Sequence, residues 1–81
     1  MKILFIGSVE FSYKFLEKLI EINSDIVGVC TKKKSSFNSD FVDLEPICNL
    51  NSIPCLHVNN INSKEGVEWI KGKKPDVIFC F

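Results

Sequence analysis

The first thirteen residues constrain the fold most, because an apolar run stops at one glycine and changes at once to a helical pattern. Ile3 to Ile6 predict a strand that is buried on both faces. A strand, a tight turn and a helix in this order indicate an α/β sheet, in which ligands bind at the carboxyl ends of the strands. We therefore expect a binding site around Gly7 to Phe11. The helix is predicted from apolar residues that recur at helical spacing, namely Phe11, Phe15, Leu16, Leu19, Ile20 and Ile22.

The rest of the chain alternates strands and helices. Val- and Ile-rich or apolar runs predict strands over 25–31, 54–58 and 76–81. A short helix is predicted over 44–51 with Asp43 as its cap, and another from Asn62, paired with Glu65 in a capping box, to Gly72. The resulting β-α-β-α-β-α-β order predicts a parallel sheet with right-handed crossovers.

Composition limits the chain to one small domain. Its 81 residues carry ten basic and ten acidic side chains, and the zero net charge argues against broad attraction to nucleic acid or to an anionic membrane. The longest apolar runs fall far short of the roughly 20 residues that a membrane-spanning helix needs. With no signal peptide before the first strand, we expect a cytoplasmic protein with no membrane partner.

The turn after the first strand lacks the glycines of the common phosphate-binding loops. A dinucleotide-binding turn needs three glycines, and only Gly7 is present; the Gly-Lys-Ser/Thr ending of a P-loop is also missing. Thr31 and Lys32, which close the second strand, include no acidic group for a ribose hydroxyl. NAD binding is not expected, and a turn that only starts a helix remains an alternative.

The cysteines and the histidine do not form a recognisable metal or catalytic motif. Cysteines 30, 48, 55 and 80 are scattered, so we interpret them as buried, reduced thiols, and no metal site is predicted. His57 stands alone at the end of a predicted strand. Because a catalytic histidine needs partners that this span does not supply, we expect a structural or surface role for it.

Three phrases carry a resemblance to a known family. Lys2–Phe11, with Gly-Ser-x-Glu-Phe at its end, resembles the Gly-Thr-Pro-Glu-Phe opening of methionyl-tRNA formyltransferases and sugar N-formyltransferases. Asn51–Pro54 resembles the family's entry to the third strand, and Lys74–Phe81 its fourth strand. The resemblance implies that 1–81 is the amino-terminal part of a formyltransferase Rossmann-like domain. Its parallel sheet would have the strand order 3-2-1-4, truncated after the fourth strand.

The loop after the second strand favours one subfamily. In the transfer-RNA enzymes this segment resembles Gln-Pro-Asp-Arg-Pro followed by a Gly/Arg/Lys-rich loop that contacts the acceptor arm. Here it reads Lys-Lys-Lys-Ser-Ser-Phe-Asn-Ser-Asp over 32–40, which resembles sugar N-formyltransferases. The lysines either attract the pyrophosphate of a nucleotide-linked amino sugar or form a solvated basic loop. We therefore expect that sugar rather than transfer RNA as the acceptor. Methionyl-tRNA formyltransferase and a non-catalytic Rossmann-like binding module are the alternatives.

The resemblance also implies the site residues. The formyl donor would be 10-formyltetrahydrofolate, and Phe81 would stand where the folate-binding loop begins. The family's catalytic Asn-x-His and Asp lie beyond the fourth strand, so no catalytic residue is assigned and the span alone is expected to be inactive. The expected acceptor-binding residues are Gly7, Ser8, Glu10, Phe11, Lys32, Lys33, Lys34, Phe37 and Asn38.

Overall fold

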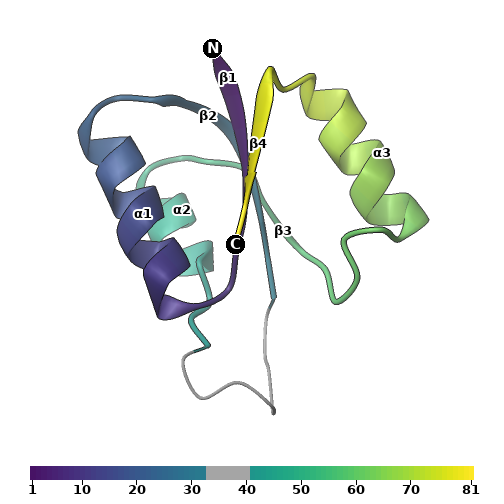
Figure 1. Ribbon diagram of the computed structural model, residues 1–81, viewed down its shortest axis with the longest axis horizontal. Helices are drawn as coiled ribbons and strands as arrows, with labels where there is room; N and C mark the ends of the chain where they lie inside the picture. The colour runs from purple at the N-terminus through teal and green to yellow at the C-terminus, as the bar shows by residue number, and fades with distance from the viewer. Residues whose placement is uncertain (33–40) are drawn as a thin grey trace.

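A computed structural model describes residues 1–32 and 41–81 of the chain. The strands form one parallel sheet in the order β3-β2-β1-β4, which confirms the predicted strand order. Helices α1 and α2 lie on one face of this sheet and α3 lies on the other (Figure 1). The elements are β1 (Lys2–Ile6), α1 (Glu10–Glu21), β2 (Asp25–Thr31), α2 (Glu45–Leu50), β3 (Cys55–His57), α3 (Lys64–Lys73) and β4 (Val77–Cys80).

The central position of β1 buries both of its faces, as its apolar sequence predicts. Phe5 is paired with Val29 of β2 and with Phe79 of β4, and it has no exposed surface. Its ring centroid lies 6.2 Å from that of Phe15 and 5.2 Å from that of Phe81. The main core lies between the sheet and the two helices α1 and α2, and its buried members are Phe5, Leu16, Leu19, Val29, Leu44, Ile47 and Cys48.

The buried face of α1 differs from the predicted stripe at both of its ends. Phe11 and Ile22 were expected on that face, but they are 65% and 59% exposed. The residues of α1 that are buried are instead Ser12, Leu16 and Leu19. This set keeps the helical spacing but begins with a small polar residue, Ser12, whose burial hydrophobicity alone does not indicate.

The other face of the sheet packs against α3 through a glycine. A Cβ atom on Gly28 would lie 2.8 Å from Cη2 of Trp69, so the bare backbone of β2 leaves room for the indole ring. Leu4, the fully buried neighbour of Phe5 on β1, lies close to the same glycine. The two faces of β1 therefore contact different helix layers.

The helix starts are shifted by one residue from their predictions. Ser63, and not Asn62, caps α3, because its Oγ accepts a hydrogen bond from the backbone N–H of Gly66 at 3.2 Å. At α2 the cap residue is Leu44, and Asp43 Oδ1 accepts from the N–H of Glu45 at 2.9 Å. Asp43 therefore satisfies a first-turn amide as expected, although it stands one position outside the cap.

Each helix is followed by a residue with a positive φ that is not glycine. These residues are Asn23 (58°), Ser52 (55°) and Lys74 (50°), and each precedes the next strand. The predicted end of the last helix at Gly72 is wrong, because α3 continues through Lys73 and Lys74 adopts the left-handed conformation. None of the helices in the described ranges is long and apolar enough to cross a membrane.

Candidate functional site

The carboxyl ends of the four strands are joined by backbone hydrogen bonds just beyond the sheet. In each bond an N–H group past the end of one strand donates to a carbonyl at the end of its neighbour. These bonds run from Gly7 to Cys30 (3.1 Å), from Val58 to Thr31 (3.0 Å) and from Phe81 to Ile6 (2.9 Å). The bonds fix the edge at which a Rossmann-like sheet binds its ligand.

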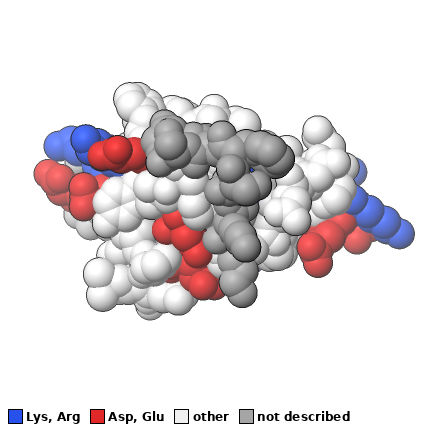
Figure 2. Space-filling view, turned by 90° about the horizontal axis from the view of Figure 1, so that it is seen from below, with Lys and Arg blue, Asp and Glu red and all other residues white. Residues whose placement is uncertain are grey.

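A cavity of about 550 Å³ lies at this edge and takes residues from all four strand ends. Figure 2 views the molecule from this side; among the described residues, most of the visible Lys atoms lie at the two sides of the view. The described lining residues of the cavity are a mixture of polar and apolar groups and include one lysine, Lys32. Its lining residues are Ile6, Gly7, Ser8, Val9, Cys30, Thr31, Lys32, Val58, Asn59, Asn60, Ile61, Cys80 and Phe81.

Close packing explains the single glycine of the first turn. A Cβ atom on Gly7 would lie 2.5 Å from Cβ of Ser12, and φ of Gly7 is not positive. Ser12 is fully buried, and its Oγ accepts a hydrogen bond from the N–H of Val9 at 3.4 Å. Gly7 is thus required because the first turn of α1 approaches the backbone so closely.

Four of the sequence-predicted site residues line this cavity, namely Gly7, Ser8, Lys32 and Phe81. The carbonyl of Ser8 accepts a hydrogen bond from the N–H of Val42 at 2.9 Å, which ties the segment before α2 to the first turn. The expected sites Lys33, Lys34, Phe37 and Asn38 lie outside the described residues.

Glu10 and Phe11 were expected at the site but do not line the cavity. Glu10 forms an exposed ion pair with Lys14, at 3.7 Å on the surface of α1. The ring of Phe11 is largely exposed and lies 5.7 Å from that of Phe81. Phe11 therefore lies beside a lining residue of the cavity without lining it, and its part in acceptor binding stays a prediction.

Sequence reasoning missed the segment that follows β3. Residues 58–61 line the cavity and include two side-chain amides, those of Asn59 and Asn60. Asn60 Oδ1 accepts a hydrogen bond from the N–H of Asn62 at 2.9 Å, which forms a turn leading toward α3. Polar residues directly after a predicted parallel strand were the available signal, because such residues share one edge with Gly7.

His57 has partners that the sequence did not reveal. Its Nε2 lies 3.0 Å from Asp43 Oδ1, and its Nδ1 lies 3.6 Å from Glu45 Oε2. The expectation that this span supplies no partner for His57 is therefore wrong. The partners come from a separate segment, 43–45, which precedes β3 by about a dozen residues and meets it only in the folded chain.

The four cysteines are free and occupy different environments. Cys30 and Cys48 are buried as predicted, whereas Cys55 is half-buried and Cys80 is exposed, which corrects the expectation for these two. A hydrogen bond between the Cys48 and Cys55 thiols raises the pKa of Cys48 and lowers that of Cys55. Burial raises the pKa of the Cys30 thiol to about 11, and the neighbouring Cys55 adds to the rise.

The raised pKa of Cys30 predicts a loss of stability in alkali. The unfolded thiol ionises near its ordinary value of 9.0, whereas the folded thiol stays protonated to about 11. The contribution of the protonated Cys30 thiol to the free energy of unfolding is therefore complete below about pH 9 and is lost as pH rises through about 11. The loss is on the order of 2 kcal/mol. In urea unfolding across this pH range, the free energy of unfolding should decline less steeply with pH in Cys30→Ala than in the parent or in Cys80→Ala. Equal slopes in all three proteins would contradict the prediction.

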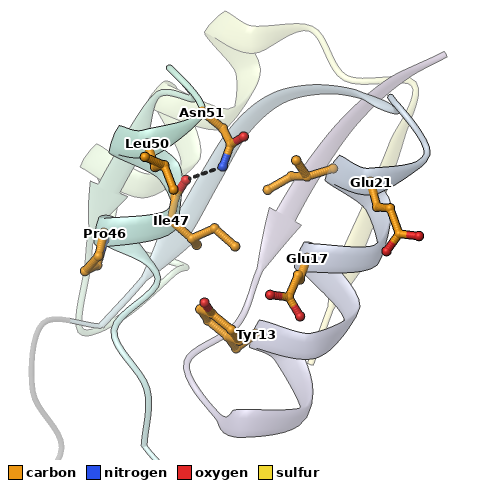
Figure 3. Close-up of a pocket in the computed structure, with 8 residues that line it drawn as sticks. Tyr13, Glu17, Glu21, Pro46, Ile47, Leu50 and Asn51 are labelled. Atoms are coloured by element: carbon orange, nitrogen blue, oxygen red, sulfur yellow. Dashed lines mark hydrogen bonds between the residues drawn. The ribbon is translucent and has the colours of Figure 1, made fainter.

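A second hollow, of about 510 Å³, lies between α1 and α2 (Figure 3). Glu17 and Glu21 of α1 border it, and Leu50 of α2 is 84% exposed beside it. The side chain of Asn51 donates a hydrogen bond to the carbonyl of Ile47 at 2.8 Å and so closes one end of α2. Among the described residues, the hollow is lined by no strand-end residue and by none of the sequence-predicted site residues.

Comparison with known proteins supports the resemblance to formyltransferases. No family model matches the chain. Curated methionyl-tRNA formyltransferases do match it: those of Thermotoga maritima (29% identical), Thermotoga sp. strain RQ2 (33%) and Clostridioides difficile strain 630 (33%). Each match covers 96% of this chain, and the chain spans 26% of the relative's length. The chain is therefore similar, over nearly all of its residues, to about a quarter of the length of these formyltransferases.

Proposed function

We propose that this chain is the amino-terminal part of an enzyme that transfers a formyl group from 10-formyltetrahydrofolate to the amino group of methionyl-tRNA. The observation that carries the proposal is its similarity, over 96% of its residues, to methionyl-tRNA formyltransferases. The cavity at the strand ends supports it, because ligands of Rossmann-like sheets bind at that edge.

This proposal replaces the nucleotide-linked amino sugar that the lysine-containing loop favoured. The relatives named above carry the transfer-RNA activity in their names, and none is a sugar N-formyltransferase. The loop argument rested mostly on residues 33–40, which lie outside the described ranges. Lys32 lies at the cavity and suits a phosphate of either acceptor, so it does not favour the sugar.

Within the proposed enzyme, this span supplies one wall of the crevice. Gly7 and Ser8 bring backbone close to the cavity, Phe81 adds an apolar surface, and the amides of Asn59 and Asn60 add polar groups. These residues are suited to binding and orienting an acceptor end rather than to moving its proton. We assign proton removal and oxyanion stabilisation to the Asn-x-His motif and the later Asp of the family; no Asn-x-His motif occurs in residues 1–81.

The acceptor is tested with the full-length protein and 10-formyltetrahydrofolate. Formylation of methionyl-tRNA and of a nucleotide-linked amino sugar would be followed separately, by acid-stable radiolabel and by mass spectrometry. We expect formylated methionyl-tRNA to accumulate and the sugar to remain unmodified. Formylation of the sugar alone would replace the proposed acceptor, and turnover of neither would favour the non-catalytic binding module.

Lys32→Ala in the full-length protein is expected to raise KM for methionyl-tRNA about fivefold, because it removes a cation at the cavity that attracts acceptor phosphates. The effect should fade at high salt, because Lys32 is exposed and salt screens an exposed charge. Lys71→Ala, an exposed lysine on α3 away from the cavity lining, is the matched control and should leave KM unchanged. A KM that does not change in Lys32→Ala at low salt would remove this residue from the site.

A further inference from the structure

We propose that Asp43, Glu45 and His57 together bind one divalent transition-metal ion, represented by Zn²⁺. One ligand atom from each side chain lies within 4.8 Å of the others. All three residues are partly buried, with side-chain exposures of 29%, 45% and 22% in that order. This inference rests on the cluster alone and does not depend on formyl transfer.

The backbone brings the three ligands together before any ion is present. Thr31, at the end of β2, pairs with His57 in the parallel register and accepts a hydrogen bond from the N–H of Leu44 on its Oγ1, at 3.4 Å. Thr31 is only 3% exposed, so this junction is part of the packed core. The segment that carries Asp43 and Glu45 is thereby attached to the strand end that carries His57.

The charges in the cluster leave it suited to a cation. Two carboxylates face one imidazole, and among residues 1–32 and 41–81 His57 is the one basic group within ion-pair distance of either carboxylate. With a neutral imidazole the three groups carry two negative charges, which repel each other at this separation. A divalent ion would neutralise both charges and use the lone pair of the imidazole nitrogen.

The donor set selects the kind of ion. Imidazole nitrogen and carboxylate oxygen are ordinary zinc ligands, at about 2.0–2.2 Å from the metal, so neighbouring ligand atoms in a tetrahedral shell lie about 3.3 Å apart. The 3.0 Å between Asp43 Oδ1 and His57 Nε2 is already close to that separation. Glu45 Oε2 lies 3.6 Å from Nδ1, the other ring nitrogen, so Glu45, the most exposed of the three side chains, must rotate toward Nε2 to share the ion. Mg²⁺ and Ca²⁺ favour all-oxygen shells, so the histidine selects a transition metal.

Binding is tested with Zn²⁺ itself on full-length protein that has been stripped with a chelator. Competition with a chromogenic chelator should give one ion per chain in the parent. His57→Gln and Asp43→Asn keep the size and the polar character of the side chains, and each is expected to weaken Zn²⁺ binding at least about 100-fold. Glu21→Gln, an exposed carboxylate on α1, is the matched control and should bind like the parent.

The cysteine thiols provide the competing explanation for any Zn²⁺ binding that is measured, because zinc also binds cysteine. Cys55→Ala should retain Zn²⁺ binding, and the Co²⁺-loaded parent should show no thiolate-to-metal charge-transfer band. Circular dichroism without metal checks that each variant is folded. Loss of binding in Cys55→Ala, equal binding in parent and His57→Gln, or no binding to folded parent protein would each overturn the proposal.

Discussion

Replacement of Phe5 with alanine is expected to lower the free energy of unfolding by about 3–5 kcal/mol. Among residues 1–32 and 41–81, Phe5 is the largest fully buried side chain, and it lies on β1 between two neighbouring strands and beneath α1. Its ring also contacts the rings of Phe15 and Phe81. Truncation would therefore leave a cavity that the surrounding sheet cannot fill by a local shift.

Urea unfolding at neutral pH would measure this loss, with Leu50→Ala as the control for removing an exposed apolar side chain. Leu50 is 84% exposed, and its truncation should change the free energy of unfolding by no more than about 0.5 kcal/mol. A loss below about 1 kcal/mol in Phe5→Ala would mean that Phe5 is not packed as described.

Gly7→Ala should destabilise the protein by about 1–3 kcal/mol, because the added Cβ enters a space that is already filled. The opposing atom is Cβ of Ser12, 2.5 Å away, which is fixed to the α1 backbone and cannot rotate aside. The second variant, Gly7→Ala with Ser12→Gly, removes that atom. The loss of stability in this double variant should be about 1 kcal/mol smaller than the sum of the losses in Gly7→Ala alone and Ser12→Gly alone.

Gly72→Ala is the matched control for a glycine that meets no neighbour. A Cβ atom on Gly72 has nothing within 4 Å, and the residue lies in the last turn of α3. This substitution should raise the free energy of unfolding by about 0.5–1 kcal/mol, since alanine is the better helix former. For the Gly7 and Ser12 variants, a double variant whose loss of stability equals the sum of the two single losses would show that the clash is relieved elsewhere.

Local patterns were enough to predict the sheet. The apolar run of β1 and the Val- and Ile-rich run of β2 gave both strands, because strands buried on two faces must be continuously apolar. The parallel order followed because helices separate the strands and right-handed crossovers leave few arrangements. The helix boundaries were less accurate. Ser63 and Lys74 were missed because a neighbouring Asn62 and Gly72 offered equally good local signals.

The candidate site was only partly predictable. Gly7, Ser8 and Lys32 could be placed at the strand ends because they directly follow strands. The grouping of His57 with Asp43 and Glu45 could not, since it depends on how the segment before α2 folds back against β2. Phe11 was misplaced because helical spacing fixes a repeat but not which of two adjacent stripes faces the sheet.

The left-handed residues that follow the helices have a consequence for engineering this fold. Asn23, Ser52 and Lys74 each stand just before a strand, so all three lie at the amino edge of the sheet, opposite the cavity. The left-handed conformation costs a residue with a side chain roughly 1–2 kcal/mol, and asparagine tolerates it best. Glycine at positions 52 and 74 would therefore raise the stability of the fold and leave the ligand-binding edge of the sheet unaltered. Thermal robustness and ligand choice can be selected at opposite ends of the same strands.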